Sequence, residues 1–424
     1  MLSKSLARAS GAYLIVNILN AAIPFMLLPI LTRYLSTTEY GVVAMFQTFV
    51  AALSAFTGLS VHGAALRKFY DLSEDKTELK DYIGACLQIL LLSSSIIFLL
   101  VFFVSDYLST LFGLNHGWLL VAVIVSAASF VVNIRMGQWQ VRNSILKYSA
   151  FLLSQSLVNL SLSLLLVIVL KLGGEGRLIA MAWTPVLFAG VALFSLGRCN
   201  LIGTSWHVNH VKEALRFGVP LIPHVAGAFL LLTIDRLVVN TKLGLGQAGI
   251  YMAAIQVSMI ASICFDAINK AFVPWLYERL SRNLIEEKQL IVKWTYIYFV
   301  FLLGLAIVGF YVGPYFIFIL TGPNYQAAQE IIGWLLLGQI FKGMYLMVTN
   351  YVFFAKKTVY LSVVTMISGL LNVLFLFLLI DYLGLHGAAI ATALAGAVQF
   401  LLTWYAANRS FQMPWTSLKV WSRP

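Results

Sequence analysis

Long apolar segments recur along the whole sequence and restrict it to structures that a lipid bilayer can hold. A helix needs about 20 residues to cross the hydrocarbon core, so 424 residues provide for about twelve spans with short connections. Hydrophobic residues make up 61% of the chain and charged residues 10%, against about 45–50% and 25% in soluble domains. The sequence therefore predicts an all-α integral membrane protein. The spans are expected at 11–33, 40–65, 82–104, 117–139, 146–170, 178–196, 217–241, 248–272, 293–318, 327–352, 358–381 and 387–407.

Lysine and arginine gather on one side of these predicted spans. Of the 28 such residues, twenty lie in the N-terminal segment, the loops after even-numbered spans and the C-terminal segment. Cytoplasmic loops carry this excess in membrane proteins, so both termini are expected in the cytoplasm. The same asymmetry explains most of the net charge of +12 without a nucleic-acid partner. On the opposite side lie Arg33, Lys171, Arg177 and Lys242.

An internal repeat connects the two ends of the chain. Residues 172–182, LGGEGRLIAMA, and residues 383–393, LGLHGAAIATA, share two glycines in register. Each stretch leads into the last span of a six-span half. Asn159 and Asn372 precede the two stretches at a similar separation. These matches indicate a duplication of six spans.

The duplication predicts two lobes of the same orientation, because six is an even number of spans. The N-terminal lobe would contain helices 1–6 within residues 1–200, and the C-terminal lobe helices 7–12 within residues 201–424. Residues 39–42 and 247–250 are a looser correspondence between the two lobes. Repeats of this kind usually enclose a substrate site between them, which favours transport over catalysis.

Charged and titratable residues within the spans are the candidate site. A charge at the bilayer centre costs at least about 2.5–3.5 kcal/mol and usually faces a cavity or a partner. Spans four and ten, which are equivalent, each carry a basic residue, as do spans two and eight. A basic cavity fits an anionic ligand such as a phosphate group. The candidates for a substrate-binding cavity are Lys342, Arg135, Lys270, His62, Arg236 and Arg33.

Other roles are open for several of these residues. Asp266 and Lys270 are four apart on one helical face and can pair with each other. Arg135 is close enough to the cytoplasmic end of its span to extend toward the interface, and Arg33 fits an interfacial anchor. Lys342 lies about 22 Å into its helix at 1.5 Å per residue, too deep to reach an interface easily.

Motifs of catalysis and cofactor binding are missing. The chain has no G-x-x-x-x-G-K-[ST] loop, no H-E-x-x-H and no C-x-x-C, so we expect no ATP site, no metal and no other cofactor. Cys86, Cys199 and Cys264 are too far apart for a metal or redox motif. The opposite-side loops are too short to hold a catalytic domain. The chain is expected to be a transporter and not an enzyme.

Three stretches resemble polysaccharide-biosynthesis flippases of the multidrug/oligosaccharidyl-lipid/polysaccharide (MOP) exporter superfamily. They are GLSVHGAALRKFYD at 58–71, the segment 217–251 and LGLHGAAIATA at 383–393. The first contains an Arg-x-Phe-Tyr-acidic run, and the second contains a proline, an Asp-Arg pair and a Gly-Ile-Tyr run. Those residues are Arg67, Phe69, Tyr70 and Asp71, then Pro220, Asp235, Arg236, Gly249, Ile250 and Tyr251.

The resemblance implies a V-shaped molecule with a central cavity in the bacterial inner membrane. Its implied cargo is an undecaprenyl-pyrophosphate-linked oligosaccharide, such as an O-antigen repeat unit, moved to the periplasmic leaflet by alternating access. Proton or sodium coupling is implied as well, with Asp235, Asp266 and His224 as candidate carriers. A polysaccharide polymerase and a chain-length regulator are the implied partners. Lipid II flippases have arginines deep in their first two helices, whereas this chain has Asn17, Asn20 and His62 there.

Three alternatives are kept. A multidrug or cation exporter of the same superfamily would share the fold. A major-facilitator transporter also has twelve spans, but residues 66–80 lack the expected G-x-x-x-D-R-x-G-R motif. A membrane-embedded polysaccharide polymerase or glycosyltransferase would need a large loop on the opposite side.

Overall fold

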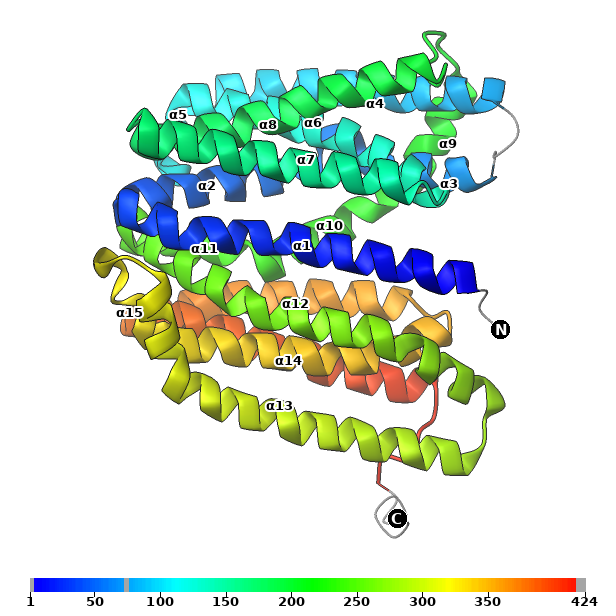
Figure 1. Cartoon of the computed structure of the whole chain (residues 1–424), viewed down its shortest axis with the longest axis vertical. Helices are drawn as coiled ribbons and strands as arrows, with labels where there is room; N and C mark the ends of the chain where they lie inside the picture. The colour runs from blue at the N-terminus through cyan, green and yellow to red at the C-terminus, as the bar shows by residue number, and fades with distance from the viewer. Residues whose placement is uncertain (1–3, 72–75, 417–424) are drawn as a thin grey trace. The chain divides into compact units, whose positions relative to one another are not determined.

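The computed structural model describes the backbone of residues 4–71 and 76–416 and the side chains of residues 16–71 and 77–416. Its contacts divide the chain into two compact units (Figure 1). Unit 1 contains Met1–Phe229 and Gly244–Gly249, and unit 2 contains Leu230–Leu243 and Ile250–Pro424. The predicted cytoplasmic charges Lys419 and Arg423 and the acidic loop residues Glu74 and Asp75 lie outside the described residues.

The helices are long and apolar enough to cross a membrane, as predicted. Within the described part of the chain, ten helices meet this condition, or eleven when one bent pair is counted as a single span. The last helix, α15 (Val359–Ser410), has 52 residues and would be about 78 Å long at 1.5 Å per residue, against a hydrocarbon core of about 30 Å. Gly384, with φ 55° and ψ −131°, breaks it where spans eleven and twelve were expected to separate. The all-helical membrane fold is confirmed.

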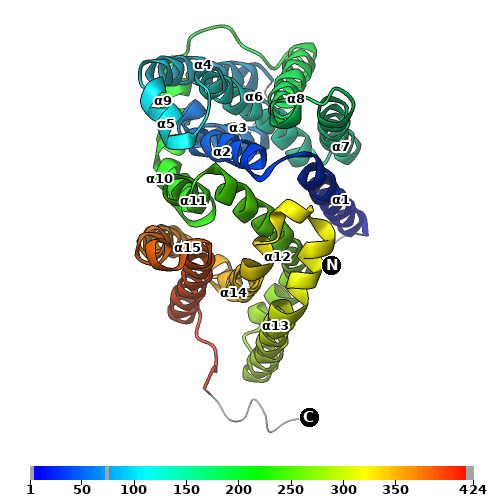
Figure 2. The ribbon, with the colours of Figure 1, turned by 90° about the vertical axis from the view of Figure 1, so that its left-hand side faces the viewer.

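Unit 1 is organised around α6, which contacts α2, α3, α4, α7 and α8 (Figure 2). Phe130 and Ile134 of α6 are buried in a core that also takes in Phe69 of α3 and Phe188 of α8. The helices of this unit are α1 (Lys4–Tyr34), α2 (Thr37–Ser54), α3 (His62–Asp71), α4 (Lys76–Phe103), α5 (Ser105–Phe112), α6 (His116–Val141), α7 (Ile145–Leu164), α8 (Gly173–Arg198), α9 (Val208–Gly218) and most of α10 (Ile222–Leu232).

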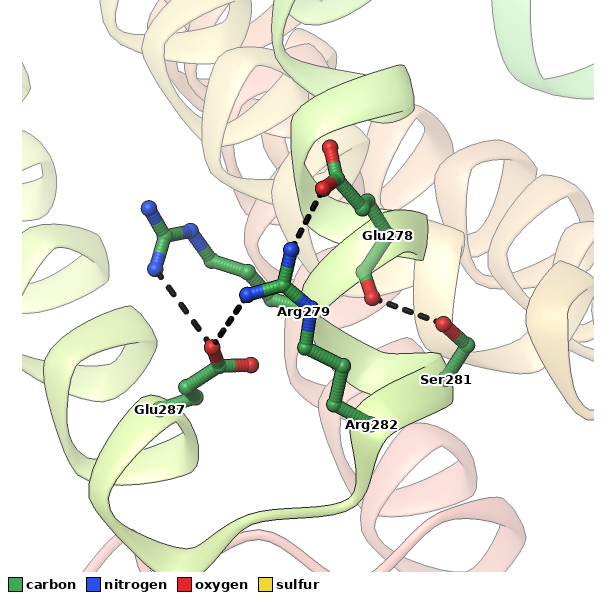
Figure 3. A network of polar contacts seen from close by, with 5 residues as sticks. All are labelled: Glu278, Arg279, Ser281, Arg282 and Glu287. Atoms are coloured by element: carbon green, nitrogen blue, oxygen red, sulfur yellow. Dashed lines mark hydrogen bonds and ion pairs between the residues drawn. The ribbon is translucent and has the colours of Figure 1, made fainter. Parts of the chain in front are cut away.

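Unit 2 is organised around α14 (Ala328–Phe354), which packs against α13 (Ile285–Leu320) on one side and α15 on the other. The other two helices of the unit are α11 (Ile234–Leu243) and α12 (Leu245–Arg282), the latter without its first five residues. An ion-pair network closes the turn between α12 and α13 (Figure 3). Arg282 reaches Glu278 at 2.6 Å and Glu287 at 2.9 Å, so the two long helices are joined firmly at this end.

Two predicted spans are broken rather than continuous. The span expected at 40–65 bends by 59° between α2 and α3, and Gly58, Leu59 and Ser60 all have positive φ there. The Gly58 N–H, which has left the helical ladder, donates to Ser93 Oγ at 2.8 Å. The span expected at 217–241 is interrupted between α10 and α11. The predicted spans did not locate either break, because the apolar composition continues through both.

The two units do not follow the predicted halves 1–200 and 201–424. Both α9 and most of α10 belong to unit 1, although they come after the predicted boundary. The connecting segment is held on α4 by backbone contacts: the Gly203 N–H donates to the Lys80 carbonyl at 3.0 Å, and Gln88 Nε2 donates to the Thr204 carbonyl at 3.1 Å.

Candidate functional site

The break between α10 and α11 positions the candidate site in unit 2. Carbonyl groups at the end of a helix lose their intrahelical partners and need others, most of all where lipid excludes water. Asn372 of α15 supplies a partner here, because its Nδ2 lies 3.1 Å from the Leu230 carbonyl and 3.4 Å from the Leu231 carbonyl. The break is thereby stabilised, and it puts Asp235 into the first turn of α11.

Asp235 is the buried acidic group of this site. Its side chain is only 2% exposed. One carboxylate oxygen accepts the backbone N–H of Arg236 at 2.9 Å, and the other accepts the Tyr251 hydroxyl at 3.0 Å. The Tyr251 oxygen lies 2.8 Å from Thr392 Oγ1. Three helices, α11, α12 and α15, thus meet at the Tyr251 hydroxyl, and no ion pair to Asp235 is present among the described residues.

A mainly apolar cavity of about 110 Å³ with several polar side chains adjoins this carboxylate. Two of its lining side chains are cationic, Arg236 and Lys342, and both are partly buried. Arg236 Nε and Gln339 Oε1 are buried without a hydrogen-bond partner in the described structure. The remaining polar lining is Asp235, Thr392 and Gln399, and the apolar lining is Leu231, Leu232, Ile255, Met259, Leu335, Gly338 and Gly396.

The chemistry of this lining fits a small anionic group or ordered water. Buried polar atoms are nearly always hydrogen-bonded in proteins, so the unpartnered atoms of Arg236 and Gln339 indicate that the cavity is hydrated or occupied in use. Guanidinium and ammonium groups bind phosphate oxygens strongly. The cavity is too small for a sugar unit, since ligand pockets usually reach about 300–1,000 Å³. Unit 2 by itself therefore offers a site for a head group and not for a whole glycan.

Two more of the predicted residues lie on α12 of unit 2. Lys270 and Asp266 form an ion pair of 2.6 Å, and both are about half exposed. Their spacing of four residues had allowed this pairing as an alternative to a role in the cavity. Asp266 also attracts Lys342 electrostatically, so one carboxylate links the two lysines.

The predicted residues of unit 1 are not brought together. Arg135 is 3% exposed; it donates to Ser195 Oγ at 2.6 Å and to Gln138, and lies 4.5 Å over the Trp139 ring. His62 meets the edge of Phe130 at 5.6 Å. Arg33 donates to the Pro29 carbonyl at 2.6 Å, and His224 is exposed on α10. Their place in a substrate cavity or in ion coupling stays a prediction.

Sequence reasoning missed the second buried cation of unit 1. Arg177 was assigned to a loop, yet it lies inside α8, is 9% exposed and donates to Asn159 Oδ1 at 2.8 Å and Ser163 Oγ at 2.5 Å. The repeat held a signal for it, because Arg177 occupies the position of Ala388 in the second copy. Tyr251, Thr392, Gln339 and Gln399 were missed because they are neutral residues within apolar runs. No cluster suited to a metal ion is found within the described ranges.

Comparison with known proteins gives the family. A sequence profile of the family described as polysaccharide biosynthesis protein matches residues 6–280. The chain belongs to this family. Two relatives from Haemophilus influenzae match over nearly their whole length. An uncharacterized membrane protein is 25% identical over 403 residues, covering 92% of this chain and 91% of the relative. Lsg locus putative protein 1 is 24% identical over 391 residues, covering 89% and 94%.

Solved structures show that this family member has the fold of the MOP superfamily. The lipid II flippase MurJ in an inward closed conformation matches with a TM-score of 0.73 at 16% identity, over 92% of this chain and 86% of MurJ. An inward-facing multidrug resistance MATE family transporter of the MOP superfamily matches with a TM-score of 0.72 at 15% identity, over 92% and 94%. At these identities the likeness speaks for the fold alone.

Proposed function

We propose that this protein is a flippase for a lipid-linked oligosaccharide. The cargo is an undecaprenyl-pyrophosphate-linked glycan, of the O-antigen repeat-unit class, and it moves from the cytoplasmic to the periplasmic leaflet by alternating access. Membership in the polysaccharide biosynthesis protein family supports the glycan, and the MOP-type fold supports transport across a bilayer.

The observation that carries the proposal is the cationic cavity of unit 2. Arg236 and Lys342 line it together with Asp235, two glutamines and a threonine, and the rest of the lining is apolar. Two cations beside one carboxylate leave a positive surplus, which suits a diphosphate and not a cationic drug. In this mechanism Lys342 and Arg236 neutralise the diphosphate while the polyprenyl chain stays in lipid.

The proposal also includes the location of the protein, its coupling ion and its partners. The charge asymmetry of the loops supports an inner-membrane protein with both ends in the cytoplasm. Asp235, held by Tyr251 and adjoining the cavity, is the candidate for proton or sodium coupling, with Asp266 and His224 as further candidates and no ATP required. A polysaccharide polymerase and a chain-length regulator are the proposed partners after translocation.

Replacement of Lys342 tests the proposal. Lys342→Gln keeps a polar side chain but removes the cavity charge, whereas Lys356→Gln removes an exposed lysine outside the cavity. In a strain lacking the chromosomal gene, we expect surface glycan to be lost with the first variant and restored with the second at equal membrane levels. Full glycan assembly with Lys342→Gln would remove the central claim.

A multidrug exporter is the second candidate, because a MATE multidrug transporter has the same fold at a TM-score of 0.72. The same deletion strain separates the two functions. A flippase predicts loss of glycan with unchanged drug susceptibility, and an exporter predicts the reverse.

A further inference from the structure

A second polar pocket lies at one end of unit 1, at the motif that carries the family resemblance. It has a volume of about 320 Å³ and is formed by α3, α4 and α9. Its side chains come from residues 64–71, from Tyr82 and from residues 213–217. These segments belong to the loops that the charge asymmetry assigns to the cytoplasm. The lining residues are Ala64, Arg67, Lys68, Asp71, Tyr82, Glu213, Arg216 and Phe217.

The Arg-x-Phe-Tyr-acidic motif contributes a buried aromatic residue, Phe69, and a cation of the pocket, Arg67. Phe69 is 1% exposed and holds α3 in the core of unit 1. Arg67 lies on the other side of the helix, where its Nε is 3.5 Å from Asp71 and its guanidinium carbon lies 6.0 Å over the Phe217 ring. This contact uses the Nε edge, so the two terminal nitrogens of Arg67 are left for a ligand.

Charges in the pocket are divided unevenly between internal pairs and free groups. Lys68 is shared by two carboxylates, Glu78 at 3.1 Å and Glu213 at 3.1 Å. Those carboxylates are therefore occupied, and Lys68 acts as a structural clamp between α3, α4 and α9. Arg216, in contrast, has neither a hydrogen bond nor an ion pair in the described part of the chain, and it is exposed. The donors available to a ligand are those of Arg216 and Arg67.

We propose that Arg67 and Arg216 form a binding site for the diphosphate of a polyprenyl lipid at the cytoplasmic leaflet. The two guanidinium groups come from helices that Lys68 fixes to each other, and guanidinium groups bind phosphate oxygens in a bidentate manner. Phe217 and Tyr82 give the pocket an aromatic wall beside these cations, which suits an amphiphile whose charged head meets its apolar chain. The site rests on the proposed function for its cargo and adds a docking step before entry into the transport cavity.

Direct binding measurements on the purified full-length protein test this site. The probes are farnesyl diphosphate, inorganic pyrophosphate and phosphatidylglycerol in detergent micelles. Arg67→Gln and Arg216→Gln should each weaken farnesyl diphosphate binding about tenfold, equal to about 1.4 kcal/mol. Lys212→Gln removes an exposed charge of α9 outside the pocket, and we expect wild-type affinity from it.

The pattern across the probes decides the ligand. Binding of farnesyl diphosphate with a weaker response to pyrophosphate supports a lipid diphosphate. Equal binding of both identifies a free-phosphate site, and equal binding of phosphatidylglycerol identifies a general anionic-lipid surface; either result overturns the proposal. Wild-type affinity in both arginine variants, each with an unchanged melting temperature, would also overturn it.

Failure of this site can be told apart from failure of the proposed function. Lys342→Gln should keep the part of farnesyl diphosphate binding that Arg67→Gln and Arg216→Gln remove, while losing glycan assembly. If the protein assembles no glycan at all but binds the probe through Arg67 and Arg216, the flippase function fails and the site stands. If glycan assembly depends on Lys342 while both arginine variants bind and assemble normally, the site fails and the function stands.

Discussion

The two repeats of the chain bury opposite charges at their polar centres. In unit 1 the buried charges are the cations Arg135 and Arg177; Arg177, which lies in the repeated stretch, is held by Asn159 and Ser163. In unit 2 it is the anion Asp235, held by Tyr251 and the backbone of Arg236. The repeat-equivalent asparagines both donate to backbone carbonyls, but their side-chain oxygens differ. Asn159 Oδ1 accepts from the Arg177 guanidinium, whereas Asn372 Oδ1 has no partner in the described structure.

This difference shows which unit can exchange a charge. Arg177 is held by Asn159 and Ser163, although its Nε has no hydrogen-bond partner in the described structure, and a guanidinium group keeps its proton in proteins. The carboxylate of unit 2 has hydrogen-bond donors but no cationic partner within 4 Å in the described structure, and it adjoins a cavity. Burying a carboxylate without a direct ion pair is unfavourable, even with the cations Arg236 and Lys342 lining the same cavity, so a proton or a cation is expected to join it. We infer that charge exchange is confined to unit 2, and that features shared by both repeats serve packing.

The largest effect is expected where the repeats agree. Gly41 of α2 and Gly249 of α12 stand at corresponding positions in the two copies, and both lie in unit 1. A Cβ atom on Gly249 would lie 2.0 Å from the Thr37 carbonyl oxygen, and one on Gly41 would lie 1.9 Å from the Leu245 carbonyl oxygen. Overpacking of this kind costs about 1–3 kcal/mol or more. We expect Gly249→Ala to abolish most folded protein in detergent, as seen by size-exclusion chromatography.

A glycine in open surroundings provides the control for this comparison. A Cβ atom on Gly304 of α13 would meet nothing within 4 Å, so Gly304→Ala should fold as the wild type does. Normal yield and melting temperature of Gly249→Ala would show that the shared glycines are not needed for packing.

The second-largest effect is expected on the transport rate, from replacement of Asp235, a charge found only in the second repeat. Asp235→Asn keeps the size of the side chain and a carbonyl acceptor for Tyr251, but removes the negative charge. We expect a transport rate in proteoliposomes at least about tenfold lower, a change of about 1.4 kcal/mol, with a melting temperature close to that of the wild type. Asp381→Asn is a suitable control, because it removes an exposed carboxylate of unit 2 outside the cavity. If both variants transport equally well, Asp235 carries no exchangeable charge.

Sequence alone predicted the spans because each is a long apolar run that lipid requires to be helical. It could not predict the breaks. Gly58, Leu59 and Ser60 adopt positive φ within such a run, and hydropathy carries no information on backbone conformation. Lys342, Arg236 and Asp235 were found because charge is expensive in a membrane. Arg177 was not, because it lies next to a loop in sequence and only its hydrogen bonds reveal that it is buried.

A smaller effect, on stability alone, is expected from Arg177. Arg177→Gln removes the cation and leaves Asn159 and Ser163 without their donor. An unsatisfied buried group costs about 1–3 kcal/mol, so we expect a lower melting temperature with an unchanged transport rate per folded molecule. Arg198→Gln, at the exposed end of the same helix, should leave both quantities unchanged. A transport defect in Arg177→Gln with a wild-type melting temperature would show that unit 1 also contains a functional charge, contrary to the comparison of the two units.

The smallest effect should come from the Tyr251 hydroxyl. Tyr251→Phe removes one donor to Asp235, and such hydrogen bonds in membrane proteins contribute about 0.6 kcal/mol on average. A double-mutant cycle with Asp235→Asn separates this contact from the neighbouring Thr392 contact. If the hydroxyl stabilises the ionised carboxylate, Tyr251→Phe should lower the melting temperature more in the wild type than in Asp235→Asn. Equal losses of melting temperature in the two backgrounds would mean that the Tyr251 hydroxyl stabilises the fold through Thr392 and not through the charge of Asp235.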